Sequence, residues 1–174
     1  MNNKYNIITI VGPTASGKTS IACHLAHRLG GEIISGDSRQ VYKGMDIGTG
    51  KDLSDYIVIG SPIPYHLIDI CDAGEKYNLF EYQQDFHEAY NDVRGRGILP
   101  ILCGGSGLYV ESVLRGYSLP NVPINNELRD NYYSMSLAQL TKILASYKPF
   151  HNTTDTENKR RAIRAIEIEE YKKQ

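Results

Sequence analysis

Apolar residues alternate between two patterns over the first two thirds of the chain. Short β-branched or apolar runs are typical of buried strands, and they occupy Tyr5–Val11, Glu32–Ser35 and Ile98–Cys103. Segments with apolar residues at helical spacing alternate with these runs, at Ser20–Leu29, Leu79–Val93 and Leu108–Leu114. Strand, loop and helix in alternation predict an α/β fold, a three-layer parallel sheet flanked by helices.

The middle of the chain carries a weaker pattern. Residues Val41–Lys51 include three glycines and read as a loop. Two short apolar runs follow, Tyr56–Ile59 and Tyr65–Ile70, separated by the turn signal Gly60-Ser61-Pro62. We expect these two runs to pair with each other as short strands.

The pattern changes after residue 118. Leu119–Asn126 is a connector rich in proline and asparagine, and Ser136–Gln139 is a capping-box signature that opens a helix through Leu144. Asn158–Tyr171 reads as a last helix with Ala162, Ile163 and Ile166 on its inner side. We therefore expect three regions, an α/β core over residues 1–118, a helical connector over 119–157, and a basic helix over 158–174 that returns to the core.

A phosphate-binding loop lies between the first strand and the first helix. It has the pattern G-x-x-x-x-G-K-[ST] and consists of Gly12, Pro13, Thr14, Ala15, Ser16, Gly17, Lys18 and Thr19. Backbone amides at a helix N-terminus favour bound anions. Lys18 would neutralise phosphate oxygens and the Thr19 hydroxyl would face Mg²⁺. The loop predicts a P-loop NTPase-like core but does not identify the phosphate compound.

Composition narrows the class of protein. The chain has 174 residues, is 41% hydrophobic and 22% charged, and has a net charge of -1, so no global charge draws it to nucleic acid or to a membrane. Apolar runs are too short for a membrane span, and the N-terminus lacks a signal-peptide pattern. Three widely spaced cysteines indicate reduced thiols. We expect a cytoplasmic protein that does not enter membranes.

Two further segments are expected beside the phosphate loop. Gly36–Gln40 follows the second strand, and Gly104-Gly105-Ser106 follows the third. Ligands in open α/β sheets bind outside the carboxyl ends of the strands, so Asp37 and Ser106 should face the loop. Asp37 could act as a base, bind Mg²⁺ through water or cap a local turn. Ser106 could contact a ligand or cap the next helix.

Several motifs in order along the chain resemble one family, the tRNA dimethylallyltransferases (isopentenyltransferases). They are Gly12–Thr19, Ser35–Tyr42, Lys43–Thr49, His66–Ile70, Tyr77–Tyr82, Gly104–Ser106 and the C-terminal Asp155 with Arg161–Glu167. Two departures stand out. Family members continue with more strands and helices after the Arg164 helix, and they commonly have Thr where this chain has Ser106.

The resemblance implies a reaction and a set of site residues. Members move a dimethylallyl group from dimethylallyl diphosphate to the exocyclic N6 amine of an adenosine beside the tRNA anticodon. By this resemblance Asp37, Lys18 and Ser106 are catalytic, residues 12–19 bind the diphosphate, and Mg²⁺ is the cofactor, held at Thr19. The implied tRNA-binding residues are Asp37, Ser38, Arg39, Gln40, Ser106, Arg129, Arg160, Arg161 and Arg164. We expect a monomer.

Other interpretations remain open from the residues alone. The basic stretch at 159–164 could be a solvated helix face, because Glu167, Glu169 and Glu170 offer partners at helical spacing. Arg39 and Gln40 could be ordinary loop residues. A small-molecule or nucleotide kinase shares the loop and the sheet, and a truncated core could bind ligand without turnover.

Overall fold

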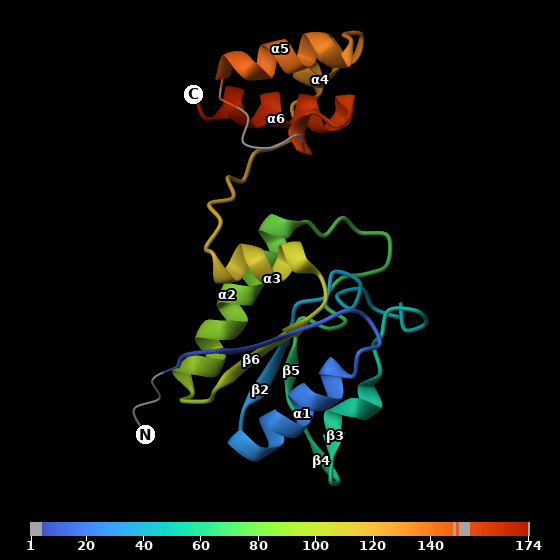
Figure 1. Ribbon diagram of the computed structural model, residues 1–174, viewed down its shortest axis with the longest axis vertical. Helices are drawn as coiled ribbons and strands as arrows, with labels where there is room; N and C mark the ends of the chain where they lie inside the picture. Colours follow the sequence, from blue (N-terminus) through green and yellow to red (C-terminus); the bar gives the residue numbers. More distant parts are fainter. Residues whose placement is uncertain (1–4, 148, 150–153, 174) are drawn as a thin grey trace. The chain divides into compact units, whose positions relative to one another are not determined.

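The computed structural model describes residues 5–147, 149 and 154–173, which divide into two compact units (Figure 1). The α/β unit is Met1–Ser118, and the helical unit is Leu119–Gln174. No helix of the described ranges has both the length and the apolar character that crossing a bilayer requires.

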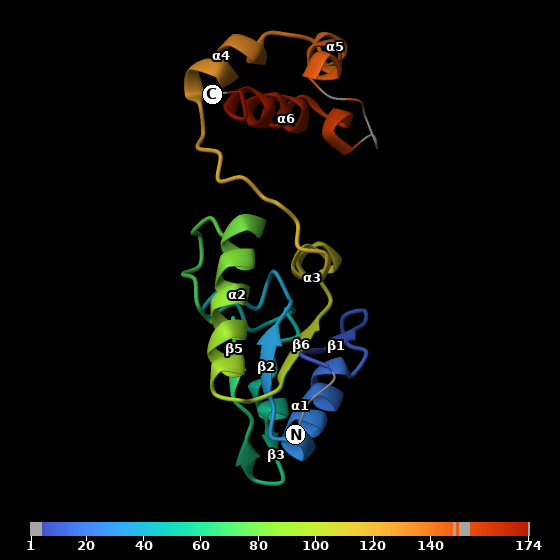
Figure 2. The same ribbon diagram turned by 90° about the vertical axis from the view of Figure 1, so that its left-hand side faces the viewer.

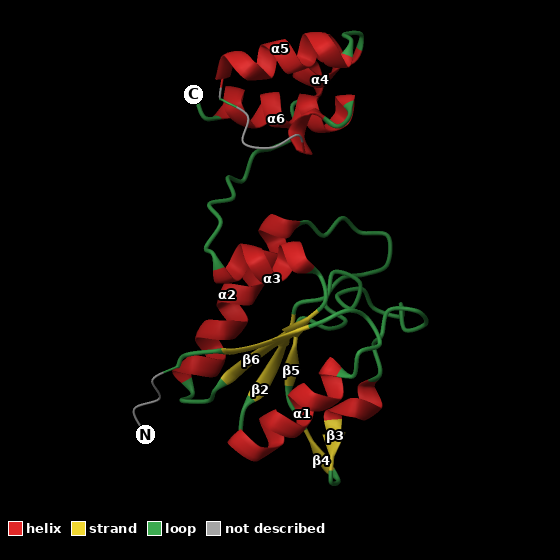
Figure 3. Cartoon of the chain, in the orientation of Figure 1, coloured by secondary structure: helices red, strands yellow, loops and turns green. Residues whose placement is uncertain are grey.

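The α/β unit is built on a parallel sheet (Figure 3). Its strands are β1 (Ile8–Val11), β2 (Glu32–Ser35), β5 (Tyr65–His66) and β6 (Pro100–Gly104). They lie in the order β1-β6-β2-β5, with all pairs parallel. The register pairs Val11 with Gly104 and Ser35 with Cys103, so β1, β2 and β6 end at one edge of the sheet. This common edge positions the loops that follow the strands.

Helices cover both faces of this sheet (Figure 2). On one face, α1 (Lys18–Leu29) packs its buried residues against Ile33 and Ile101. On the other, α2 (Leu79–Gly95) and α3 (Gly107–Leu114) pack against Ile34 and Leu102. Neighbouring strand residues point to opposite faces, which explains the continuous apolar runs in strands buried on both sides. The predicted three-layer, P-loop NTPase-like fold is confirmed.

The predicted pairing of the two middle runs is wrong. β3 (Ile57–Val58) pairs antiparallel with β4 (Ser61–Pro62), and a 3₁₀ helix, η1 (Leu53–Tyr56), precedes them. The two residues between the strands, Ile59 and Gly60, both have positive φ, which a two-residue hairpin turn of this type requires. Because the run Tyr56–Ile59 pairs across this tight turn with Ser61–Pro62, β5 instead extends the parallel sheet beside β2.

The helical unit contains α4 (Asn126–Tyr133), α5 (Leu137–Tyr147), a 3₁₀ helix η2 (Thr154–Thr156) and α6 (Lys159–Tyr171). The predicted capping box is confirmed, because the Gln139 amide donates to Ser136 Oγ and the Ser136 amide donates to Gln139 Oε1. The helix α4 is not predicted by the sequence pattern.

A separate apolar core holds this unit together. Its fully buried members include Leu140 and Leu144 of α5 and Ala162 and Ile166 of α6. The buried face of α6 thus packs on α5 within the helical unit. The predicted boundary after residue 118 coincides with the division between the two units, and the predicted return of residues 158–174 to the core stays a prediction.

Candidate functional site

The phosphate loop connects the end of β1 to the first turn of α1. Ala15 and Gly17 have φ of 61° and 77°, a left-handed conformation that turns the backbone sharply before the helix. Gly17 occupies the N-cap position with no side-chain cap, which leaves the first amides of α1 to a ligand. Lys18 Nζ donates to the Pro13 carbonyl oxygen at 3.1 Å. The ammonium therefore lies over the loop, where a phosphate oxygen can replace that carbonyl.

Glycines bring the ends of three strands close together. A Cβ on Gly105 would lie 3.1 Å from the Gly12 carbonyl oxygen and 3.5 Å from Lys18 Nζ. A Cβ on Gly104 would lie 2.3 Å from the Gly36 carbonyl oxygen, a distance too short for any side chain at this position. The segment after β6 is thus wedged between the phosphate loop and the segment after β2. This places Asp37 and Ser106 at the same edge as the loop.

Asp37 lies in a turn directly after β2. Its Oδ1 accepts a hydrogen bond from the Arg39 amide at 2.9 Å, and its own amide donates to Ser35 Oγ at 3.3 Å. The Asp37 side chain therefore caps a local turn, as one of the interpretations from the sequence predicts. A carboxylate has about four acceptor positions, so one amide leaves it able to accept further protons or donors.

Ser106 occupies the N-cap position of α3 but does not cap the helix with its side chain. Its Oγ accepts from the Ser38 amide at 2.9 Å and donates to Ser38 Oγ at 3.1 Å. The hydroxyl therefore fastens the Asp37 turn to the end of β6. Its predicted contact with a nucleotide stays a prediction.

A buried thiol shows how close the predicted residues lie. Burial raises the pKa of Cys103 to about 11, Lys18 and Thr19 act to lower that pKa, and the Asp37 charge acts to raise it. All three side chains are thus within electrostatic reach of one sulfur atom at the end of β6. The structure brings together the predicted phosphate ligands and the predicted base.

The remaining residues of the Asp37 segment differ in exposure. Gln40 is buried, accepts a hydrogen bond from Ser35 Oγ at 2.9 Å and donates to the Gly50 carbonyl oxygen at 3.2 Å. Arg39 is exposed. Gln40 therefore connects the segment after β2 to the glycine-rich loop, and its predicted RNA contact stays a prediction.

The predicted tRNA-binding arginines of the helical unit have acidic partners. Arg129 and Arg164 both pair with the buried carboxylate of Glu167, the former at 2.8 Å. Burial acts to raise the pKa of Glu167, but the hydrogen bonds from the two arginines outweigh it and hold the pKa below its usual value. Arg161 pairs with Glu157 in an exposed position, and Arg160 is exposed. The expectation of glutamate partners at helical spacing is met at Arg164.

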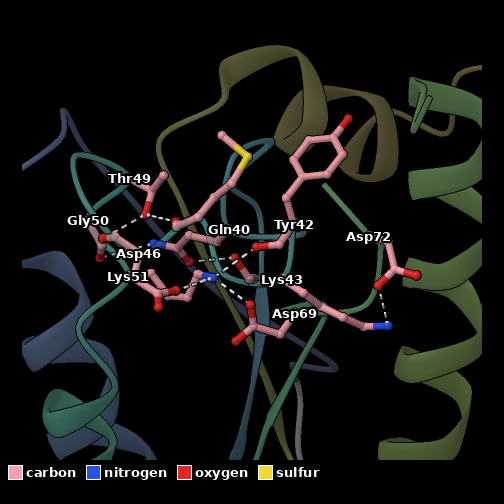
Figure 4. A network of polar contacts seen from close by, with 11 residues as sticks. Gln40, Tyr42, Lys43, Asp46, Thr49, Gly50, Lys51, Asp69 and Asp72 are labelled. Atoms are coloured by element: carbon pink, nitrogen blue, oxygen red, sulfur yellow. Dashed lines mark hydrogen bonds and ion pairs between the residues drawn. The ribbon is translucent and has the colours of Figure 1, made fainter. Parts of the chain in front are cut away.

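A buried lysine that the sequence analysis did not single out lies next to this edge. Lys51 Nζ contacts Asp46 and Asp69 and donates to the Tyr42 carbonyl oxygen (Figure 4). A lysine at the end of a glycine-rich loop, with aspartates nearby in sequence, gave no periodic signal. Only the fold reveals that the three groups meet.

The side chains around Thr19 can be compared with the oxygen ligands that Mg²⁺ prefers. Among the described residues, no three His, Cys, Asp or Glu side chains gather as a metal site. Mg²⁺ keeps several waters and is usually bound through one or two protein oxygens plus substrate phosphates. The Thr19 hydroxyl at the loop could supply one such oxygen, and the magnesium site there stays a prediction.

The geometry defines a class: an α/β protein whose phosphate loop faces a carboxylate and a hydroxyl across the carboxyl ends of parallel strands. Comparison with known families identifies the family within this class. The family model described as IPP transferase matches residues 40–174, and the isopentenyl transferase model matches residues 5–58. The chain belongs to the IPP transferase family, which confirms the resemblance seen in its motifs.

Individual relatives agree with this assignment. The chain is 63% identical over 170 residues to tRNA dimethylallyltransferase 2 of Phocaeicola vulgatus, covering 98% of this chain and 55% of the relative. It is 64% identical over 165 residues to tRNA dimethylallyltransferase 1 of Porphyromonas gingivalis, covering 95% of this chain and 55% of the relative. The chain thus spans about half the length of the curated relatives it matches.

Solved structures show the same likeness. The full-length tRNA isopentenylpyrophosphate transferase of Bacillus halodurans superposes with a TM-score of 0.62 at 39% identity, over 95% of this chain and 55% of that one. A eukaryotic dimethylallyltransferase acting on tRNA gives a TM-score of 0.77 at 26% identity, over 94% of this chain and 41% of that one.

Proposed function

We propose that this chain carries the catalytic core of a tRNA dimethylallyltransferase. The reaction transfers a dimethylallyl group from dimethylallyl diphosphate to the exocyclic N6 amine of an adenosine adjacent to the tRNA anticodon. A carbon–nitrogen bond forms, the allylic carbon–oxygen bond breaks, the amine loses a proton and diphosphate leaves. One observation carries the proposal: Asp37 and the phosphate loop lie at the same edge of the sheet, where the ends of β1, β2 and β6 come together.

The phosphate loop suits the leaving group. Negative charge grows on the diphosphate as the allylic bond breaks, so preorganised donors help most at this position. The amides at the start of α1 and the Lys18 ammonium supply them. A magnesium ion at Thr19 would neutralise further phosphate charge.

Asp37 suits the proton transfer. An aromatic amine is a poor nucleophile, and an acceptor that orients it and takes its proton assists the attack. Asp37 is held in place by the Arg39 amide and indirectly by Ser106, which binds the neighbouring Ser38. In this proposal Ser106 also contacts the target nucleotide, and Ser38, Arg39 and Gln40 line the RNA side of the site.

The target base must leave its stack to reach such an edge, as base-modifying enzymes require. Additional RNA contacts come in this proposal from Arg160 and Arg161 of the helical unit, because Arg129 and Arg164 are bound to the buried Glu167. The relatives named for this activity are about twice as long as the matched region, so further RNA-binding surface would belong to the remaining half. We place the enzyme in the cytoplasm, as a monomer that uses Mg²⁺.

The test incubates the protein with labelled dimethylallyl diphosphate, Mg²⁺ and bulk tRNA. We expect label in the tRNA at an adenosine beside the anticodon, together with released diphosphate. A parallel reaction with labelled ATP in place of the prenyl donor tests phosphoryl transfer, and label transfer from ATP alone would identify a kinase instead. Donor binding without transfer to any tRNA would show that this chain is a ligand-binding core only.

A further inference from the structure

The most unusual polar group in the α/β unit is the side chain of Lys51, which is only 1% exposed (Figure 4). An ammonium has three N–H donors, and here it meets three acceptors: Asp69 Oδ1 at 2.5 Å, Asp46 Oδ1 at 2.8 Å and the Tyr42 carbonyl oxygen at 2.9 Å. Burial acts to lower the pKa of Lys51, but the hydrogen bonds that it donates to the two aspartates outweigh burial and raise the pKa. The lysine is therefore charged and fully satisfied.

The three acceptors come from two segments. Tyr42 and Asp46 lie in the glycine-rich loop that ends at Lys51, and Asp69 follows β5. Asp69 has a φ of 56°, a strained value for a residue with a side chain, and its amide donates to the Gln40 carbonyl oxygen at 3.0 Å. Strain of this kind persists only where surrounding contacts hold it. Lys51 supplies such a contact.

The segments joined by Lys51 lead directly to the candidate site. Gly50, the neighbour of Lys51, accepts from the buried Gln40 amide, and a Cβ on Gly50 would lie 3.7 Å from Thr14 Cγ2 of the phosphate loop. Gln40 in turn accepts from Ser35 Oγ, which accepts from the Asp37 amide. One side of Gly50 thus faces the phosphate loop, and the other is bonded to the turn that carries Asp37.

We propose that Lys51 is a positioning residue: it fixes the loop over residues 42–51 so that Asp37 and the phosphate loop keep their relative geometry. Lys51 is buried beneath this loop and does not itself contact substrate. The proposal rests on the function proposed above for its effect on turnover, but its structural part stands on the described contacts. It extends the site to a cluster of Lys51, Asp46 and Asp69.

The chain offers a matched control in the same loop. Lys43 also pairs with an aspartate, Asp72, at 2.9 Å, but both side chains are more than half exposed. An exposed ion pair of this kind contributes little to stability. Lys43→Met therefore removes one lysine, one ion pair and one charge without touching the cluster.

The main variant is Lys51→Met, which keeps the length of the side chain and leaves no buried charge. The side chains of Asp46 and Asp69, which lose their partner in this variant, are 65% and 34% exposed, so water can solvate them. We measure amide hydrogen exchange over residues 36–51, the affinity for dimethylallyl diphosphate in Mg²⁺ buffer, and single-turnover transfer to tRNA with both substrates saturating.

We expect Lys51→Met to speed amide exchange over residues 36–51 by about tenfold or more. Local opening of this segment would then cost less free energy, because the contacts of Lys51 no longer have to be broken. Exchange in α5 and α6 stays at the wild-type rate. Transfer falls by roughly 10²-fold, the size reported for small misplacements of reacting groups, while donor affinity changes by less than about threefold. Lys43→Met behaves as wild type in all three measurements.

Equal exchange over residues 36–51 in Lys51→Met and wild type would overturn the proposal, as would an equal effect of Lys43→Met. If Lys51→Met does not fold, Asp69→Asn is compared with Asp72→Asn, and only the former should speed exchange. A wild type that binds donor but transfers nothing would refute the proposed function. Hydrogen exchange would then still decide whether Lys51 fixes the loop.

Discussion

The two units hold their cationic side chains in different ways. In the α/β unit, Lys18 rests on a backbone carbonyl oxygen at the mouth of the phosphate loop. In the helical unit, Arg129 and Arg164 are bound to Glu167, whose side chain is 1% exposed. Lys18 can exchange its partner for a phosphate and leave only a neutral carbonyl behind. Either arginine that did so would leave a buried carboxylate with one fewer partner, which is unfavourable.

A basic sequence alone therefore does not identify a phosphate contact. What matters is the partner that the cation leaves behind. Arg161 and its partner Glu157 are both about half exposed, so water can replace either of them. By this criterion Lys18 and Arg161 are available to ligands, whereas Arg129 and Arg164 serve the helical unit first. Four predictions test this comparison.

Asp37→Asn is expected to produce the largest loss. Asn is nearly isosteric and can still accept from the Arg39 amide, but it cannot take a proton at neutral pH. General-base catalysis contributes about 10²–10⁴-fold in rate, or roughly 3–5 kcal/mol of barrier, so single-turnover transfer should fall by that factor. Binding of both substrates should change little.

Asp52→Asn is the matched control for this variant. Asp52 also accepts from the amide two residues on, that of Ser54, at 3.0 Å, but it caps η1 and not the turn after β2. It should retain wild-type transfer. A single-turnover rate for Asp37→Asn within about threefold of wild type, well below the general-base range, would leave Asp37 with a positioning or metal-organising role.

Lys18→Ala should weaken donor binding. A hydrogen bond to a charged group contributes about 1.5–3 kcal/mol, which corresponds to a loss of about 10–150-fold in affinity for dimethylallyl diphosphate. Calorimetric titration in Mg²⁺ buffer measures it. Arg28→Ala, at the exposed far end of the same helix, is the control and should bind normally. Unchanged affinity in Lys18→Ala would place the donor elsewhere.

Glu32 predicts the acid response of the α/β unit. Hydrogen bonds from Arg96 outweigh the effect of burial and, with help from His66, lower the pKa of Glu32 from 4.5 to about 2. Because this folded-state pKa is depressed, the stabilisation is complete above about pH 4.5 and is lost as pH falls toward about 2. A shift of this size is worth about 3 kcal/mol.

Denaturant titrations of wild type and Glu32→Gln between pH 7 and pH 3 measure this effect. The variant should be less stable at pH 7, and the difference should shrink as the pH falls. Glu88→Gln, an exposed glutamate of α2, should follow the wild-type curve. A Glu32→Gln deficit that is constant with pH would mean that the loss is one of packing and not of charge.

Local sequence patterns predicted those parts of the fold that depend on near neighbours. The phosphate loop, the β2 and β6 strands and the capping box at Ser136 follow from residue type and spacing alone. The pairing of Tyr56–Ile59 was missed because a turn of two residues, Ile59 and Gly60, competes with the longer turn that the proline suggests. Helix α4 was missed because it is short and has no fully buried residue, and only Leu128 and Tyr132 pack against the core of the helical unit.

The site divides in the same way. Asp37 and Ser106 could be placed at one sheet edge because both follow strands, and strand ends meet at an edge. The Lys51 cluster could not be found, since Asp69 follows β5 and meets the loop that carries Asp46 and Lys51 only after the chain folds. The same holds for the contact of Glu167 with Arg129, which is 38 residues away, whereas the contact of Glu167 with Arg164 follows from helical spacing. Contacts between distant segments carry no periodic signal.

The smallest and most discriminating effect concerns the arginines of the helical unit. Arg161→Ala should reduce the slope of log tRNA affinity against log salt by about 1, because each phosphate contact releases a counterion, and should leave thermal stability unchanged. Arg164→Ala should lower the stability of the helical unit, since Arg164 also donates to the Val122 carbonyl oxygen and its loss leaves Glu167 with Arg129 and the Asn125 amide. Filter binding over a salt series and thermal unfolding measure the two quantities. If Arg164→Ala instead flattens the salt slope at wild-type stability, a buried partner does not withhold an arginine from RNA, and the distinction drawn between the two units fails.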